Sequence, residues 1–289
     1  MAVIAITGAS GAVGSRVAAR LAARGVPLRL VVRDPAPAPE LEGAEVRVAS
    51  DYGNGEEMRR ALEGASTAYI ISAGADEHRI DLHKSAVDAA VAAGAERIVY
   101  TSYVASAPDC TFTYARDHFH TEEHVKATGL GWTFLRDSMY LDLVPVFAGA
   151  DGVIRGPAGS GKVAPVARDD IADVVAEVLT GDGHDGQTYD LTGPRAFTFA
   201  EAATVLSSFA GRPVVYEDET LEEARASRAP TGAPAWEIEG WVTSYAAVAT
   251  GEMDVVSDAV DRIAGHPPMT LEEFLRRNPE SYAHLAGSD

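Results

Sequence analysis

The sequence has very little cysteine and few basic residues. Its 289 residues include one cysteine, Cys110, which excludes an internal disulfide and a metal cluster built on cysteines. Lysine and arginine together number 24, against 43 aspartates and glutamates, so the formal net charge is −19. A surface with this charge repels phosphate backbones and anionic lipid headgroups. We therefore expect no nucleic-acid partner and no membrane partner.

Long apolar runs are missing as well. No stretch approaches the roughly 18 consecutive apolar residues that indicate a membrane-spanning helix. No signal-peptide pattern precedes the first strand, and no repeat or long linker is present. Hydrophobic residues make up 46% of the chain, enough for one sizeable core with a smaller lobe. We expect a cytoplasmic protein, either a monomer or a homodimer, that acts on small molecules.

The chain opens on a glycine-rich turn between a strand and a helix. Residues 3–7 are typical of a buried strand, Gly8, Gly11 and Gly14 follow, and an apolar helix pattern runs to about Arg24. One glycine permits the sharp turn, a second lets a phosphate approach the backbone, and a third lets helix and strand pack closely. The turn predicts a pyrophosphate site at the helix N-terminus. Because its spacing is one residue wider than the usual fingerprint, an ordinary strand–turn–helix is the alternative.

Apolar strands alternate with helices along the first half of the chain. This alternation predicts a parallel sheet covered on both faces, and right-handed crossovers then give a doubly wound, Rossmann-like α/β fold. The expected strands span residues 3–7, 27–32, 44–49, 67–72, 96–101 and 132–135. The expected helices that follow the first one span residues 55–62, 78–93 and 114–128. On helix 78–93 the expected apolar positions are Ile80, Leu82, Val87 and Val91.

The second half is less regular and indicates a smaller, mainly helical lobe. Residues 149–161 are glycine-rich and read as a mobile connection, whereas 169–179 and 187–191 are typical of a helix and a strand. Three T-x-x-E patterns, beginning at residues 198, 220 and 270, predict capping boxes that open short helices, and 235–250 is a further helix. We predict an NAD(P)-binding domain at residues 1–150, to which 169–192 return, and a substrate-binding lobe at 151–289.

Arg33 follows the second strand, beside the expected position of the adenosine ribose. Sites specific for NAD often place an acid there, whereas an arginine pairs with a 2′-phosphate. Arg33 therefore predicts NADP(H), with NAD(H) as the alternative cofactor. A surface arginine paired with Asp34 is the other interpretation of this residue. Asp51, after the third strand, is either an adenine contact or a plain loop aspartate.

The carboxyl ends of the fourth and fifth strands converge where an open sheet binds its ligand. Small residues after the fourth strand allow close approach of the nicotinamide ribose, although they also suit a simple turn. The predicted cofactor contacts are Gly8, Ser10, Gly11, Ala12, Val13, Gly14, Arg33, Asp51, Ser72, Ala73, Gly74, Thr101, Ser102 and Tyr103.

Several segments together resemble a known family. TGASGAVG, VVRDP, IVYTS, DHFHTEEHVKATGLGWTFLRDSMY, VARDDIAD and QTYDLTGP occur in the order and spacing of the NmrA-like branch of atypical short-chain dehydrogenases/reductases. Within it, the chain looks most like the type 2 NAD(P)H:quinone oxidoreductases. The resemblance covers essentially the whole chain. It implies a Rossmann-like domain, a small C-terminal lobe and NADP(H) binding through Gly8, Gly11, Gly14 and Arg33.

One departure from the wider family concerns the catalytic residues. Typical members use Tyr-x-x-x-Lys, in which the lysine lowers the pKa of the tyrosine and holds the ribose. None of the three lysines here lies four residues after a tyrosine, and His118 takes that place relative to Tyr114. At the end of the fifth strand, Tyr103 stands where a serine is usual, with Ser102 and Ser106 only as neighbours.

Three interpretations of the activity remain. In the first, NADPH passes hydride to a quinone or enone, and the protein mainly orients the two rings. His118 then protonates the product near neutral pH, or holds a ribose hydroxyl or a backbone carbonyl instead, and Tyr114 or Tyr140 supplies a hydrogen bond. In the second, the protein senses NAD(P) without chemistry, as the resemblance implies for some NmrA-like proteins. The third is an isomerase or dehydratase that retains its cofactor.

A substrate pocket would separate the first two interpretations. Residues 136–140 are expected to form one of its walls, with Asp137 and Ser138 where family members often have Asn-Gly. Trp236, Trp241 and Tyr245 form either a lid or the core of the lobe. No metal site is predicted, because His120 and His124 share a helix face but Glu123 does not complete the H-E-x-x-H order.

Overall fold

The structure is a computed structural model that describes residues 2–285. The chain forms two compact units. Unit 1 runs up to Ser106 and takes in residues 117–136 and 169–189. Unit 2 consists of residues 107–116, residues 137–168 and the chain from Asp190 onward. The chain thus passes between the units at several points rather than once near residue 150, and residues 169–189 return to the first unit.

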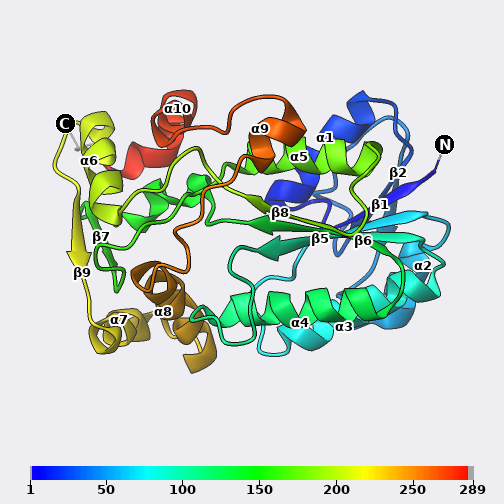
Figure 1. Ribbon diagram of the computed structural model, residues 1–289, viewed down its shortest axis with the longest axis horizontal. Helices are drawn as coiled ribbons and strands as arrows, with labels where there is room; N and C mark the ends of the chain where they lie inside the picture. Colours follow the sequence, from blue (N-terminus) through cyan, green and yellow to red (C-terminus); the bar gives the residue numbers. More distant parts are fainter. Residues whose placement is uncertain (1, 286–289) are drawn as a thin grey trace. The chain divides into compact units, whose positions relative to one another are not determined.

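Unit 1 is built on a seven-stranded sheet with the strand order β3-β2-β1-β4-β5-β6-β8 (Figure 1). The pairs β1–β2, β2–β3, β1–β4 and β4–β5 are parallel. Because β1 lies between β2 and β4, the strand order reverses beside it, and open sheets bind ligands at such a point. The strands are β1 (Ile4–Thr7), β2 (Leu28–Val32), β3 (Ala44–Val48), β4 (Thr67–Ile70), β5 (Arg97–Tyr103), β6 (Gly131–Asp137) and β8 (Gln187–Leu191).

Helices cover both faces of this sheet. Figure 1 shows α1 (Ala12–Ala23) and α5 (Arg168–Thr180) on one face, and α2 (Gly55–Leu62), α3 (Arg79–Ala92) and α4 (Thr113–Ala127) on the other. Ion pairs join α1 and its C-cap Arg24 to α5, among them Arg20 with Asp173 and Arg24 with Glu177, each with a nitrogen–oxygen distance of 2.5 Å. The predicted doubly wound α/β fold is confirmed.

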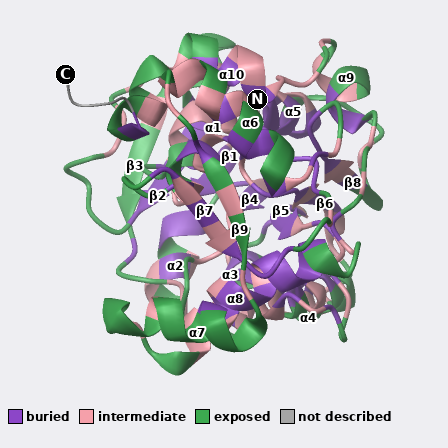
Figure 2. Ribbon diagram, turned by 90° about the vertical axis from the view of Figure 1, so that its left-hand side faces the viewer, coloured by how far each residue is buried: buried purple, intermediate pink, exposed green. Residues whose placement is uncertain are grey.

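The glycine turn brings α1 against β1. Gly8 has a φ of +60°, a left-handed conformation that favours glycine. A Cβ atom on Gly14 would lie 2.3 Å from the carbonyl oxygen of Gly8, so only hydrogen fits between helix and turn. The apolar stripe of α1, which includes Val17 and Leu21, is thereby buried against the sheet. At the sheet edge, by contrast, most of β3 is exposed (Figure 2).

Helix α3 buries a different face from the predicted one. Val87 is buried as expected, but Ile80 and Leu82 are only half-buried and Val91 is 40% exposed. The buried face begins instead with two polar residues one turn apart, Arg79 and His83. Polar groups are buried only where hydrogen bonds satisfy them. The spacing of apolar residues does not reveal which polar residues have such partners.

Unit 2 is mainly helical, and its predicted capping boxes are confirmed. In each box, the threonine side chain accepts a hydrogen bond from the backbone amide of the glutamate three residues later. The side chain of that glutamate accepts a hydrogen bond from the backbone amide of the threonine. The helices are α6 (Phe199–Ala210), α7 (Leu221–Arg228), α8 (Ala235–Ala249), α9 (Ala259–Ala264) and α10 (Leu271–Arg277). Short 3-10 helices are η1 (Leu141–Leu143), η2 (Pro145–Phe147), η3 (Ala229–Thr231) and η4 (Pro279–Leu285).

Unit 2 also contains a two-stranded parallel sheet that was not predicted. It pairs β7 (Val153–Gly156) with β9 (Val215–Asp218), so the expectation of a mobile connection over residues 149–161 was wrong. Gly156 serves close packing there, because a Cβ on it would lie 2.3 Å from the ring of Tyr245. Tyr245 is itself buried beside Phe147 and Phe199, with ring centroids 5.9 and 5.0 Å away, so it belongs to the core. Trp236 and Trp241 are half-buried.

Among residues 2–285, no helix is long and apolar enough to cross a lipid bilayer.

The contact at Gly14 yields a prediction for stability. We expect Gly14→Ala to lower the free energy of unfolding by about 1–3 kcal/mol, the usual cost of overpacking a tight contact. Urea denaturation measures this change. Gly74→Ala is the matched control, because no heavy atom lies within 4 Å of a Cβ there. Equal stability of the two variants would mean that α1 does not depend on the close approach at Gly14.

Candidate functional site

A cavity of about 500 Å³ lies within unit 1, next to the carboxyl ends of β1, β2 and β4. This is the point where the strand order reverses. The cavity is lined by Gly8, Ser10, Gly11, Val31, Val32, Arg33, Ala49, Asp51, Tyr52, Met58, Ile71, Ser72, Ala73, Gly74, Ala75, Asp76 and Leu82. Eight of the fourteen predicted cofactor residues are among them: Gly8, Ser10, Gly11, Arg33, Asp51, Ser72, Ala73 and Gly74.

The glycine turn gives the cavity an anion-binding wall. Gly8, Ser10 and Gly11 line it, and Gly11 is the N-cap of α1 without a side-chain hydrogen bond of its own. The first turn of a helix carries N–H groups that have no partner within the helix, and its dipole favours negative charge. Ala12, Val13 and Gly14 form this first turn but do not line the cavity. The turn therefore fits the pyrophosphate of a dinucleotide.

Arg33 is the one cationic side chain among the residues that line this cavity, and it is exposed. The neighbouring Asp34 accepts a hydrogen bond from the amide of Ala36 at 2.9 Å. Asp51 also lines the cavity, but its Oδ1 accepts from the amides of Gly53 (2.5 Å) and Asn54 (3.1 Å), which shapes the turn before α2. Arg33 is thus placed for an anionic group, while the Asp51 carboxylate is engaged in a turn.

The segment after β4 is anchored by residues that the sequence analysis missed. The amide of Ile71 donates to Thr7 Oγ1 at 3.0 Å, and Tyr52 donates its hydroxyl hydrogen to the Ile71 carbonyl at 2.7 Å. The amide of Ala73 donates to His83 Nε2, and Arg79 Nε donates to the Ala73 carbonyl, both at 2.9 Å.

The available signal for these anchors was two polar residues, Arg79 and His83, one helical turn apart directly after a small-residue segment. Periodicity analysis treats such positions as solvent-facing.

His118 is buried and held neutral by its partners. Its Nε2 lies 3.0 Å from the Arg79 guanidinium, and its Nδ1 lies 2.9 Å from the Tyr100 hydroxyl. Because a guanidinium only donates, Nε2 must accept and carries no proton. Burial lowers the pKa of His118 well below its usual value of 6.5, and the charge of Arg79 lowers it further. The Nε2 atom therefore has no proton to donate, so the structure does not support the expectation that His118 acts as an acid near neutral pH, and His118 contacts Arg79 and Tyr100 instead.

The side chains predicted at the end of β5 do not line the cavity. Thr101 Oγ1 lies 2.7 Å from the Tyr69 hydroxyl within the buried interior. Ser102 donates to Glu122 at 2.5 Å, and Arg136 binds both oxygens of the same carboxylate. The ring of Tyr103 stacks on His118 with centroids 6.2 Å apart. The hydroxyls of Thr101 and Ser102 are thus engaged inside unit 1.

The two tyrosines predicted to be catalytic lie in unit 2. The ring of Tyr114 packs over Gly240 of α8, where a Cβ would come within 2.6 Å of it. The ring of Tyr140 lies 4.6 Å from the Arg168 guanidinium, and its hydroxyl is 3.4 Å from Asp137 Oδ2. Burial raises the pKa of Asp137 well above its usual value.

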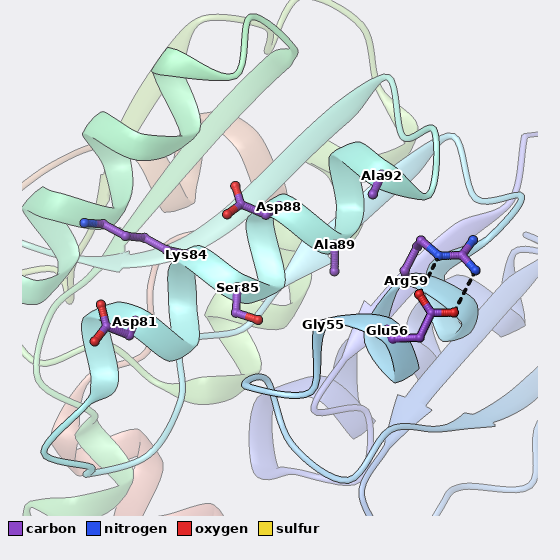
Figure 3. Close-up of a pocket in the computed structure, with 9 residues that line it drawn as sticks. All are labelled: Gly55, Glu56, Arg59, Asp81, Lys84, Ser85, Asp88, Ala89 and Ala92. Atoms are coloured by element: carbon purple, nitrogen blue, oxygen red, sulfur yellow. Dashed lines mark hydrogen bonds and ion pairs between the residues drawn. The ribbon is translucent and has the colours of Figure 1, made fainter.

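A second hollow, of about 450 Å³, lies between α2 and α3 and opens widely to solvent. Its charges are mixed in sign: Figure 3 shows Arg59 paired with Glu56, at 3.0 Å, with Lys84 and Asp88 on the facing helix. Asp88 is 2.7 Å from His124, one of the two histidines considered above for a metal. Because its charges partly neutralise one another, we assign no ligand to this hollow.

The buried histidines lead to a prediction about protonation. His83 Nε2 accepts from the Ala73 amide, and His118 Nε2 accepts from the Arg79 guanidinium. Each neutral ring therefore carries its proton on Nδ1. Burial lowers the pKa of His83 as well. The unfolded chain takes up protons below about pH 6.5. The free energy of unfolding is therefore not reduced by these two histidines above that pH, and it falls as the pH drops below it.

In nitrogen-15 NMR spectra we expect both rings to remain neutral Nδ1–H tautomers from pH 8 to pH 6. A protonation midpoint within that range for either ring would contradict the assigned hydrogen bonds.

Comparison with known proteins agrees with this site. A family model described as NAD(P)H-binding matches residues 8–182. The chain is 30% identical to an NAD(P)H azoreductase of Xenophilus azovorans over 283 residues, covering 96% of this chain and 99% of the relative. It is 33% identical to quinone oxidoreductase 2 of Escherichia coli over 280 residues, covering 94% and 97%.

Solved structures show the same relationship. A crystal structure of the Escherichia coli NADPH-dependent quinone oxidoreductase in complex with NADPH superposes with a TM-score of 0.86, at 31% identity, over 95% of this chain and 99% of that one. The negative transcriptional regulator NmrA, at 18% identity and a TM-score of 0.74, covers 95% and 94% and shares the fold. The cavity with its glycine turn and Arg33 fits NADP(H), and the chain belongs to the NAD(P)H-binding family of oxidoreductases.

Proposed function

We propose that this chain reduces a quinone, or a related conjugated carbonyl compound, with NADPH as the hydride donor. The observation that carries the proposal is the cavity of unit 1, in which a glycine turn and a single cation are placed for a phosphorylated dinucleotide. The full-length similarity to an azoreductase and a quinone oxidoreductase supports a conjugated electron acceptor. When bound, the nicotinamide supplies two electrons and a proton as hydride.

In this mechanism the residues of the chain bind and orient the cofactor. The glycine turn that ends at the N-cap of α1 holds the pyrophosphate, Arg33 pairs with the 2′-phosphate, and the segment 71–76 forms the adjoining wall. The glycine turn places no side chain between the backbone and the phosphates. Orientation of this kind contributes much of the rate when the cofactor carries the reactive group.

The protonation step favours a quinone over a simple ketone. Hydride addition to a ketone leaves a localised, strongly basic alkoxide, which needs a positioned acid. Addition to a quinone leaves an aromatic anion whose charge is delocalised, and water can protonate it to the quinol. The sequence has no Tyr-x-x-x-Lys motif, and His118 has its Nε2 bonded to Arg79. We therefore propose solvent as the proton source, with Tyr114 and Tyr140 as candidate hydrogen-bond donors to the substrate.

Three further assignments are proposals. Substrate binding is assigned to residues 151–289, where α6 and α8 contribute Phe199 and Tyr245 to an aromatic cluster of unit 2. The protein acts in the cytoplasm, and it works as a monomer or a homodimer.

The proposal is tested by following NADPH oxidation at 340 nm with a panel of quinones, enones and saturated ketones. We expect turnover with quinones, weaker turnover with enones, and none with the ketones, because the last group requires a positioned acid and the proposed mechanism takes its proton from solvent. Boiled enzyme and NADPH alone are the controls. Tight NADPH binding without oxidation by any acceptor would instead favour the non-catalytic sensor.

A separate test concerns cofactor choice. We expect Arg33→Gln to weaken NADPH binding by about 10- to 100-fold, the loss of a charge-assisted hydrogen bond, while NADH binding changes little. Isothermal titration calorimetry measures both. Arg60→Gln is the matched control, because Arg60 is exposed on α2 and does not line the cavity. Equal losses for NADPH and NADH would remove Arg33 from the 2′-phosphate role.

A further inference from the structure

The Ala73 backbone is held on both sides by buried side chains of α3. Its N–H donates to His83 Nε2 and its carbonyl accepts from Arg79 Nε, each at 2.9 Å. His83 is fully buried and Arg79 is 6% exposed. Ala73 itself belongs to an irregular segment, residues 71–76, that lines the cofactor cavity. Two buried polar side chains are thus committed to one peptide of a loop.

Helix α4 fixes these two side chains in turn. The Arg79 guanidinium contacts Asp117 at 3.3 Å and His118 Nε2 at 3.0 Å. His83 Nδ1 lies 2.9 Å from Thr121 Oγ1 and 3.1 Å from the Tyr100 hydroxyl.

Three groups in this network have a fixed role as hydrogen-bond donor or acceptor. Arg79 only donates, His83 Nε2 accepts from an amide, and Thr121 donates to the Asp117 carbonyl at 2.8 Å. The network therefore holds Ala73 in one orientation.

We infer that Arg79 and His83 are positioning residues for the dinucleotide, acting through the Ala73 peptide. The inference rests on cofactor binding in the cavity of unit 1 and requires no particular electron acceptor. If the segment were released, only a fraction of molecules would present the binding-competent wall, and the apparent affinity would fall by that fraction. Because the 2′-phosphate is assigned to Arg33 and not to this wall, we expect the loss to be the same for NADPH and NADH.

His83→Leu tests the inference because it removes the acceptor without adding bulk. We expect the dissociation constants of NADPH and NADH to rise together, by about tenfold, as for one lost hydrogen bond at a buried site. The ratio between the two cofactors stays at its wild-type value. His83→Gln restores binding to within a few-fold of wild type, because the amide oxygen of glutamine accepts the Ala73 N–H.

Thr133→Val is the matched control for a merely structural role. Thr133 is buried in unit 1, where its Oγ1 accepts from Arg97 at 2.8 Å and donates to the His184 carbonyl at 2.7 Å, but it belongs neither to the network around Ala73 nor to the lining of the cavity. We expect it to lower the melting temperature while both dissociation constants remain unchanged. Equal weakening of cofactor binding in Thr133→Val and His83→Leu would overturn the inference, as would wild-type affinity in His83→Leu or failure of His83→Gln to restore it.

A measurement on the unaltered protein covers the case in which His83→Leu does not fold. We expect the Ala73 amide hydrogen to exchange with solvent as slowly as the amides of β4, even without cofactor. Rapid exchange at Ala73 alone would overturn the inference. All of these measurements use NADPH and NADH binding or amide exchange, so they remain decisive even if no quinone is reduced.

Discussion

The buried guanidinium of Arg79 connects the cofactor wall to the interior of unit 1. A buried cation is stable only where its donors are satisfied, and this one reaches the Ala73 carbonyl, Asp117 and His118. One consequence is structural, because the irregular segment after β4 acquires a fixed orientation. The other is chemical, because a guanidinium that donates to Nε2 leaves this nitrogen of His118 without a proton to give. The same interaction therefore shapes the binding site and limits the reaction it can support.

That limit agrees with the rest of the site. The glycine turn, the N-terminus of α1 and Arg33 are all suited to binding phosphates, and none of them donates a proton to a reacting carbonyl. A site that binds the cofactor without a positioned acid can reduce acceptors that become stable anions when they take up hydride. Quinones meet this condition, and so do other extended conjugated systems. The sensor hypothesis shares the cofactor site, but the relative that supports it most directly shares only the fold at 18% identity.

Local sequence patterns predicted most of the fold. Strands β1, β2, β4 and β5, the helix 55–62 and the three capping boxes follow from apolar runs and from the T-x-x-E spacing, which act over a few residues. Strand β7 was missed because the need for Gly156 arises from Tyr245, a residue distant in sequence. In the site, Gly8, Gly11 and Arg33 were predictable because the fingerprint is local. Arg79 and His83 were not, because their partners come from β5, α4 and the segment after β4. Thr101 and Ser102 were misplaced for a related reason, since strand position alone does not show which hydroxyls the interior already uses.

The central claim is that hydride passes directly from bound NADPH to a conjugated acceptor. An anaerobic single-turnover experiment with stoichiometric enzyme, NADPH and a 1,4-naphthoquinone tests it most directly, with product analysis and with NADPH deuterated at either face of C4. The account predicts one NADP⁺ and one quinol for each NADPH, and slower reaction for deuterium on one face only. NADPH that stays bound and reduced, or an equal rate for every deuterated cofactor, would contradict it.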